Sequence, residues 1–140
     1  MKKPRTSPAA TPRGRARGAT SVLLDAHRGN LLAEACPSRE VLKHVTSRWG
    51  VLVFVALRDG PRRFAALRRR IGGVSDKMLA QTLRTLADDG FVARTVHDDT
   101  PVRVEYALTP LGESLAERLV ALTDWIEEHV AEVPSLASTG

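Results

Sequence analysis

Long hydrogen-bonding side chains recur at helical spacing in the segment 75–87. Lys77, Gln81 and Arg84 follow one another at intervals of four and three residues, which places them on one face of an α-helix. In the major groove of DNA, lysine and arginine pair with guanine and glutamine pairs with adenine. This face therefore has the chemistry of a DNA-reading surface. The residues expected to meet base edges are Ser75, Lys77, Met78, Gln81 and Arg84.

A dense group of arginines precedes this helix and extends its positive charge. Between residues 58 and 84 the chain carries eight basic residues and two acidic ones. Basic side chains neutralise DNA phosphates, which holds a protein in register on the duplex and makes its binding depend on salt. A solvated arginine face on two ordinary amphipathic helices is the alternative interpretation. The candidates for phosphate contacts are Arg62, Arg63, Arg68, Arg69, Arg70 and, later in the chain, Arg103.

Apolar spacing predicts two helices that would hold these side chains in place. The leucines of segment 75–87 lie on the face opposite the polar one, so that face can be buried in a core. The segment 64–71 repeats apolar residues at the same helical spacing. Gly72-Gly73 between them supports a tight turn, because glycine adopts positive φ without steric cost, and Ser75 can cap the second helix. The pattern predicts a helix-turn-helix.

Two short strands are predicted after the second helix. The first covers residues 91–96, and the second covers 102–108, where apolar and polar residues alternate. A helix-turn-helix followed by such a hairpin is a winged helix, and its wing would carry Arg103 and Arg94 toward the DNA backbone or minor groove. Asp98 and Asp99 lie in the connection between the strands. Because carboxylates repel phosphates, we expect the tip of the wing to sit off the DNA.

Two further helices are predicted before the helix-turn-helix. Cys36-Pro37 is typical of a helix start, since proline is tolerated in the first turn. The run 49–57 is rich in β-branched residues and favours a strand by local propensity. We nevertheless expect a buried helix there, partly from the family resemblance given below. The predicted fold class is mainly α with a small β-hairpin, a winged helix-turn-helix with a C-terminal dimerisation helix.

The predicted C-terminal helix, residues 109–131, carries a long apolar stripe. Thr109 is a suitable cap, and Pro110 is suited to the first helical position. The helix lies beyond the compact winged unit, so its stripe requires a partner, and two-fold dimers are the commonest oligomers. Folding back onto its own domain is the alternative. The residues predicted to pair two copies are Leu115, Leu119, Leu122, Trp125 and Ile126.

At 140 residues the chain is long enough for one domain with tails. Residues 1–20 carry six basic residues and no acidic one, lack apolar periodicity, and are predicted to form a disordered basic arm. Residues 21–35 form an N-terminal extension that is either a short helix or a loop. The winged domain with its terminal helix spans 36–131, and 132–140 is predicted to be a frayed tail.

Charge and cysteine content indicate the class of protein and its compartment. Residues 85–140 carry three basic and eleven acidic residues, in contrast to the basic segment 58–84. A protein with one basic stripe and one acidic end can orient itself on a polyanion such as DNA. No apolar run approaches the roughly 20 residues needed to span a bilayer, and the basic start lacks the apolar region of a secretory signal. With a single cysteine and no intrachain disulfide, we expect a cytoplasmic location and no membrane partner.

An ordered set of motifs resembles the HxlR-type winged helix-turn-helix transcriptional regulators of bacteria. The resemblance covers roughly residues 36–130 and implies a homodimer that binds double-stranded DNA and pairs through its terminal helices. The chain differs from that pattern at Ser47-Arg48, where family members often have Gly or Lys, and in the long arm before residue 36. The motifs are Cys36-Pro37, Trp49, Gly60-Pro61-Arg62-Arg63-Phe64, Ile71-Gly72-Gly73-Val74-Ser75, Lys77-Met78-Leu79, Asp89-Gly90-Phe91-Val92, and Val104-Glu105-Tyr106 with Leu108-Thr109 and Gly112.

Cys36 is the candidate sensor of an oxidant or electrophile. It precedes a predicted helix, whose dipole favours a thiolate, and the resemblance implies that some relatives sense through a cysteine in this region. An inert, partly buried thiol is the alternative, because the chain has no second cysteine to resolve a sulfenate, although a disulfide across a dimer stays open. A regulator that responds to a small molecule without cysteine chemistry is therefore the second interpretation.

Other classes of function fit the sequence less well. Cys36 and His44 are eight residues apart, about 12 Å along a helix, which is too far for proton transfer. No phosphate-binding glycine loop and no metal-ligand spacing among the histidines is present, so we expect no catalytic residues, no metal and no cofactor. A winged helix used only for protein contacts would show no salt-dependent DNA affinity. A nucleoid-type protein would depend on residues 1–20 for binding.

Overall fold

The computed structural model describes residues 30–137. The chain divides into two compact units, Met1–Leu42 and Lys43–Gly140, which are described separately. The predicted basic arm, residues 1–20, and most of the predicted extension, 21–35, lie outside the described residues. None of the helices within 30–137 combines the length and the apolar character needed to cross a membrane.

The described part of the first unit consists of turns followed by the start of a helix. Residues 30–35 form successive turns, so the end of the predicted extension has no helix. Helix α2 (Ser38–Thr46) begins two residues after Cys36. Cys36 and Pro37 therefore lie immediately before the helix rather than in its first turn, a difference within the usual uncertainty of predicted helix ends.

The apolar run 49–57 forms helix α3 (Arg48–Leu57), as predicted against its local strand propensity. The Ser47 side chain caps this helix by accepting a hydrogen bond from the Gly50 amide at 3.1 Å. Val53 and Phe54 are fully buried, because α3 packs against both α5 and α6 as well as the sheet. A helix that is covered on several sides gains more from burial than its residues lose in propensity.

Helices α4 (Phe64–Arg70) and α5 (Asp76–Asp88) form the predicted helix-turn-helix. The turn contains Gly73 at φ +85°, a left-handed conformation that favours glycine. Ser75 caps α5, and its hydroxyl accepts from the Met78 amide at 3.0 Å. Leu79, Leu83 and Leu86 are buried on the inner face of α5, as the spacing predicted.

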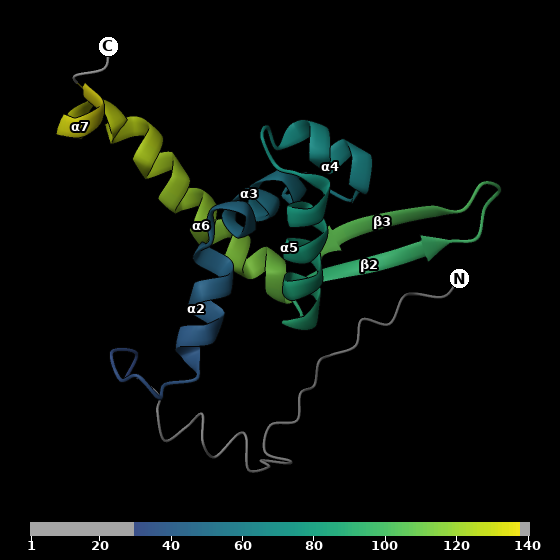
Figure 1. Ribbon diagram of the computed structural model, residues 1–140, viewed down its shortest axis with the longest axis horizontal. Helices are drawn as coiled ribbons and strands as arrows, with labels where there is room; N and C mark the ends of the chain where they lie inside the picture. The colour runs from purple at the N-terminus through teal and green to yellow at the C-terminus, as the bar shows by residue number, and fades with distance from the viewer. Residues whose placement is uncertain (1–29, 138–140) are drawn as a thin grey trace, which may run out of the picture. The chain divides into compact units, whose positions relative to one another are not determined.

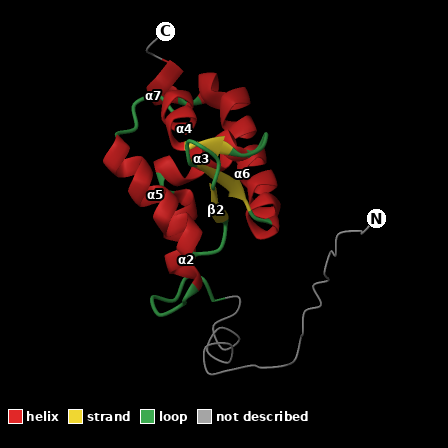
Figure 2. Cartoon of the chain, turned by 90° about the vertical axis from the view of Figure 1, so that its right-hand side faces the viewer, coloured by secondary structure: helices red, strands yellow, loops and turns green. Residues whose placement is uncertain are grey.

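The predicted hairpin is present, and a third short strand joins it. Strands β2 (Val92–His97) and β3 (Arg103–Leu108) pair antiparallel, with Val92 opposite Leu108. Strand β1 (Arg62–Arg63) pairs with the other edge of β3, giving the order β1-β3-β2. Figure 1 shows the wing as the long green hairpin beside α5, and Figure 2 shows the small yellow sheet among the red helices. The fold is a winged helix-turn-helix, mainly helical with a small antiparallel sheet.

The start of helix α6 (Pro110–His129) is hydrogen-bonded to the residues that directly follow the helix-turn-helix. The Thr109 amide donates to the Phe91 carbonyl at 3.0 Å, and the Thr109 hydroxyl donates to the Gly90 carbonyl at 2.6 Å. The same hydroxyl accepts from the Gly112 amide at 3.0 Å and caps the helix. A Cβ atom at Gly112 would lie only 2.1 Å from the Phe91 carbonyl oxygen. The absence of a side chain at Gly112 is therefore a requirement of this close approach.

The chain after α6 is more regular than the predicted frayed tail. A 3₁₀ turn, η1 (Val130–Glu132), follows directly, and a short helix, α7 (Pro134–Ala137), comes after it. Every described residue from 130 to 136 is exposed. The last residues of the predicted tail, 138–140, lie outside the described part of the chain.

Candidate nucleic-acid interface

The outer face of α5 presents the polar residues that the sequence singled out. Lys77, Gln81 and Arg84 are all exposed, and Met78 is 40% exposed beside them. The three buried leucines on the opposite side fix the rotation of the helix, so this outer face is the one available to a ligand. Ser75 is also exposed, but its hydroxyl oxygen serves as the helix cap. Of the predicted base-reading residues, Ser75 alone therefore has a structural role in the described chain.

The arginines predicted to contact phosphates before α5, called the basic stripe (Arg62, Arg63, Arg68, Arg69 and Arg70), differ in whether they already pair with a carboxylate. Arg68 Nε lies 2.5 Å from Asp76 Oδ1, and Arg70 lies 3.4 Å from Asp59. Both pairs are exposed, so water screens them and their net contribution is small. A phosphate could replace such a carboxylate partner, at the cost of breaking the existing pair.

Three other stripe positions have different surroundings. Arg62 is partly buried in β1, where its Nε donates to the Ala56 carbonyl at 3.0 Å. Arg63 and Arg69 are exposed and make no ion pair within residues 30–137. Arg63 and Arg69 are therefore the arginines most readily available to a phosphate.

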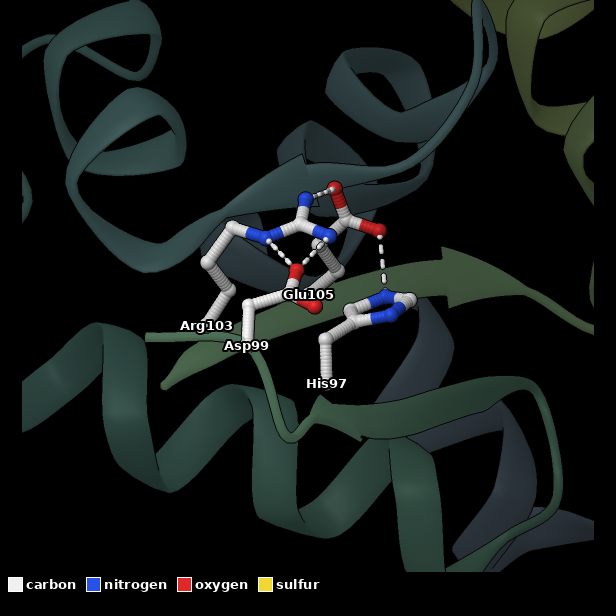
Figure 3. Close-up of polar contacts among 4 residues, drawn as sticks. All are labelled: His97, Asp99, Arg103 and Glu105. Atoms are coloured by element: carbon white, nitrogen blue, oxygen red, sulfur yellow. Dashed lines mark hydrogen bonds and ion pairs between the residues drawn. The ribbon is translucent and has the colours of Figure 1, made fainter. Parts of the chain in front are cut away.

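Arg103 is held in a network of charged groups on the wing (Figure 3). Its Nε and Nη2 donate to one oxygen of Asp99 at 2.9 and 2.6 Å. Its Nη1 lies 3.6 Å from Glu105, and the other oxygen of Glu105 lies 3.0 Å from His97 Nε2. Two carboxylates thus surround one guanidinium, and this arrangement opposes the predicted phosphate contact at Arg103.

A groove between α5 and the wing contains Arg94, the second wing arginine that the sequence predicted to approach DNA. The groove has a volume of about 210 Å³ and includes Arg84 from α5 together with Arg94 and Tyr106 from the sheet. Arg94 pairs directly with Tyr106 across β2 and β3.

The apolar stripe of α6 separates into a buried part and an exposed part. Leu119 is only 6% exposed within the chain, and Leu115 packs partly against the same core. Further along, Leu122 and Ile126 are exposed, and Trp125 is 56% exposed while it stacks on His129. The start of α6 therefore folds onto its own domain, as the alternative interpretation held. The exposed end leaves an apolar surface of three large side chains.

Cys36, the candidate sensor, is buried. Cys36, the one cysteine of the sequence, is 4% exposed. Within residues 30–137, no group of three or more histidine, cysteine or acidic side chains could hold a metal ion.

Comparison with known proteins identifies the family to which the chain belongs. The sequence profile of the HxlR-like helix-turn-helix family matches residues 44–134, which contain α3 to α6 and the whole wing. The chain belongs to this family. A helix-turn-helix transcriptional regulator of the family from Escherichia coli K12, YtfH, is 64% identical over 105 residues, covering 75% of this chain and 83% of the relative. The predicted family and the predicted winged helix-turn-helix fold are therefore confirmed.

Solved structures of other transcriptional regulators show the same fold. The regulator YtfH from Salmonella typhimurium aligns with a TM-score of 0.72 at 59% identity, covering 79% of this chain and 98% of that one. The redox regulator HypR in its oxidised form aligns with a TM-score of 0.62 at 33% identity, covering 66% and 96%. The chain is a member of a family of transcriptional regulators whose recognition unit is a winged helix-turn-helix.

Proposed function

We propose that the protein is a homodimeric regulator that binds specific double-stranded DNA sequences with α5 in the major groove. The observation that carries this proposal is the exposure of Lys77, Gln81 and Arg84 on a helix whose other face is buried. A major groove accepts one α-helix, and these three side chains match guanine and adenine edges. In a two-fold dimer, the two half-sites would lie about 10 base pairs apart, or a multiple of that.

The backbone contacts in this proposal come from the exposed arginines on both sides of α5. Arg63 and Arg69 lie on the helix-turn-helix side, and Arg94 lines the groove on the wing side. Arg68 and Arg70 can contribute after exchanging their carboxylate partners. Selection of bound sequences from a random DNA pool tests the proposal directly, because it reports binding, symmetry and half-site spacing together. A pool with no enriched motif would contradict sequence-specific recognition.

Gln81→Ala and Arg69→Ala should weaken DNA binding in different ways. Loss of the Gln81 amide removes discrimination at one base pair, about 1–3 kcal/mol, and leaves affinity for other sequences nearly unchanged. Loss of Arg69 weakens all sequences alike and reduces the salt slope of binding by about one. Binding measured at several salt concentrations on the selected site and on single-base variants distinguishes them.

Arg118→Ala is the matched control for Arg69→Ala. It removes one positive charge from an exposed position of α6, outside the proposed interface, where Arg118 hydrogen-bonds Ser114. It should leave both the preferred sequence and the salt slope unchanged. If Gln81→Ala and Arg69→Ala gave the same sequence preference and salt slope, the division into base and phosphate contacts would be wrong.

Redox control through Cys36 is the second candidate function. It is supported by the structural likeness to HypR, which is a redox regulator, and opposed by the burial of the thiol, since an inaccessible thiol reacts slowly. This candidate predicts that hydrogen peroxide or a quinone releases the wild-type protein from DNA and does not release Cys36→Ser. Release is measured by fluorescence anisotropy of labelled DNA. Equal release of both proteins would reject sensing through Cys36 and favour the alternative, a regulator that responds to a small molecule without cysteine chemistry.

A further inference from the structure

A second hollow lies on the other side of α5, away from the wing. It has a volume of about 210 Å³ and is enclosed by the turn between α2 and α3 and by one flank of α5. Its lining combines three apolar side chains, those of Trp49, Met78 and Leu86, with polar ones. Pockets for larger organic ligands are usually about 300–1,000 Å³. The smaller volume here suits a molecule with a single ring.

The charges around this cavity are positive. Lys43 lines it, is exposed, and has no carboxylate partner within residues 30–137. The guanidinium of Arg48 stands over the Trp49 ring, with its Cζ atom 5.0 Å from the ring centroid. Asp89, the carboxylate that approaches a lining residue, is already paired with His44 Nδ1 at 2.7 Å. An anionic group at the mouth of the cavity would therefore meet a cation with no competing carboxylate.

We propose that this cavity binds a small aromatic carboxylate, with its ring between Trp49 and Met78 and its carboxylate on Lys43. Indole and thioether groups both make favourable contacts with an aromatic ring. An inorganic anion or a DNA phosphate would leave the apolar side chains of Trp49 and Met78 without a partner in the cavity. The combination of apolar walls and a single ammonium group selects a ring that carries one acidic substituent.

An occupant of this cavity would act on DNA binding directly. Met78 and Gln81 both line the cavity and belong to the face proposed to read bases. Trp49 also reaches the turn of the helix-turn-helix, where its Cη2 atom is 3.8 Å from the position of a Cβ on Gly73. A bound ligand would thus hold Met78 and Gln81 in one arrangement, whereas binding in the major groove requires these side chains to adopt a different one. This consequence rests on the proposed function, whereas the binding of the ligand does not.

Titration of the full-length protein with sodium benzoate tests the site by ¹H–¹⁵N NMR. The chain has two tryptophans, so it gives two indole N–H signals, which Trp49→Phe assigns. Benzoate should shift the Trp49 signal in a saturable manner and leave the Trp125 signal in place. Sodium sulfate at equal ionic strength should shift neither. No saturable shift, or an equal shift by sulfate, would overturn the proposal.

Two variants test the assigned contacts. Lys43→Met should weaken benzoate about five- to tenfold, because it removes one charge-assisted hydrogen bond near the surface, and should leave the affinity for neutral benzyl alcohol unchanged. Thr85→Leu places extra methyl groups in the cavity and should abolish binding of both probes while the other amide signals keep their positions. Equal affinity of wild type and Lys43→Met for benzoate would overturn the role of Lys43.

Competition with DNA separates this inference from the proposed function. If the cavity acts on base reading, saturating benzoate should lower affinity for the selected DNA site about tenfold or more, and Thr85→Leu should be insensitive to benzoate. Binding of benzoate with unchanged DNA affinity would refute the coupling and leave the ligand site standing. If the protein bound no DNA at all, the proposed function would fail, and the NMR titration would still show whether the cavity binds benzoate.

Discussion

Ile126→Glu should convert the proposed homodimer to a monomer and lower the affinity for a two-half-site operator about a hundredfold. Ile126 lies with Leu122 and Trp125 on the exposed end of α6, where three large apolar side chains face solvent in the single chain. A glutamate there would have to lose its hydration without gaining a partner when two such surfaces meet. Joining two binding modules typically raises affinity by a factor of 10² to 10⁴, so separation removes that gain.

Light scattering and DNA titration of the same sample measure the two effects together. Ser114→Glu is the matched control, because it introduces the same charge on an exposed position of α6 away from the apolar stripe. It should remain a dimer and bind DNA as the wild type does. Should Ile126→Glu also remain a dimer, the exposed end of α6 would not be the interface. Leu119, which is buried in the core of its own chain, would not serve in this test because its replacement would unfold the domain.

Gly112→Ala should destabilise the folded domain by about 3 kcal/mol, a large part of the total for a domain of this size. The added methyl would lie 2.1 Å from the Phe91 carbonyl oxygen, and the contacted group is backbone rather than the flexible end of a side chain. Relief requires the start of α6 to move away from Phe91, which breaks the hydrogen bonds that Thr109 makes to Phe91 and Gly90. Urea unfolding followed by circular dichroism gives the free energy of unfolding.

Gly72→Ala is the control for that measurement. Gly72 has no positive φ, and a Cβ there would meet nothing within 4 Å. The substitution should leave stability unchanged or raise it by about 0.5 kcal/mol, since alanine has fewer conformations in the unfolded chain. Similar losses at both positions would show that the close approach at Gly112 is not what constrains the fold.

The features that depend on local sequence were predicted well. Leu79, Leu83 and Leu86 repeat at helical spacing and are buried, so the exposure of Lys77, Gln81 and Arg84 followed from the same pattern. The caps at Ser75 and Thr109 were recognisable because each needs only one hydroxyl at the correct position. Burial of α3 was harder to predict, because its β-branched residues favour a strand locally and its helical form depends on the elements packed around it.

Features that depend on distant partners were not available from sequence. Strand β1 has only two residues, Arg62 and Arg63, and no alternating pattern, so only its pairing with β3 identifies it. The division of the α6 stripe also depends on where the core ends, which spacing alone does not contain. The base contacts, the phosphate contacts and the dimer surface remain predictions, since each involves a partner molecule.

Two arginines of the basic stripe and one of the wing form ion pairs with carboxylates in the protein without DNA. Arg68 pairs with Asp76, Arg70 with Asp59, and Arg103 with Asp99. When such an arginine turns to a phosphate, the abandoned aspartate must regain water and attract a cation from solution. Uptake of cations by the protein then offsets part of the cation release from the duplex. Affinity should therefore fall less steeply with rising salt than the number of arginines alone would suggest.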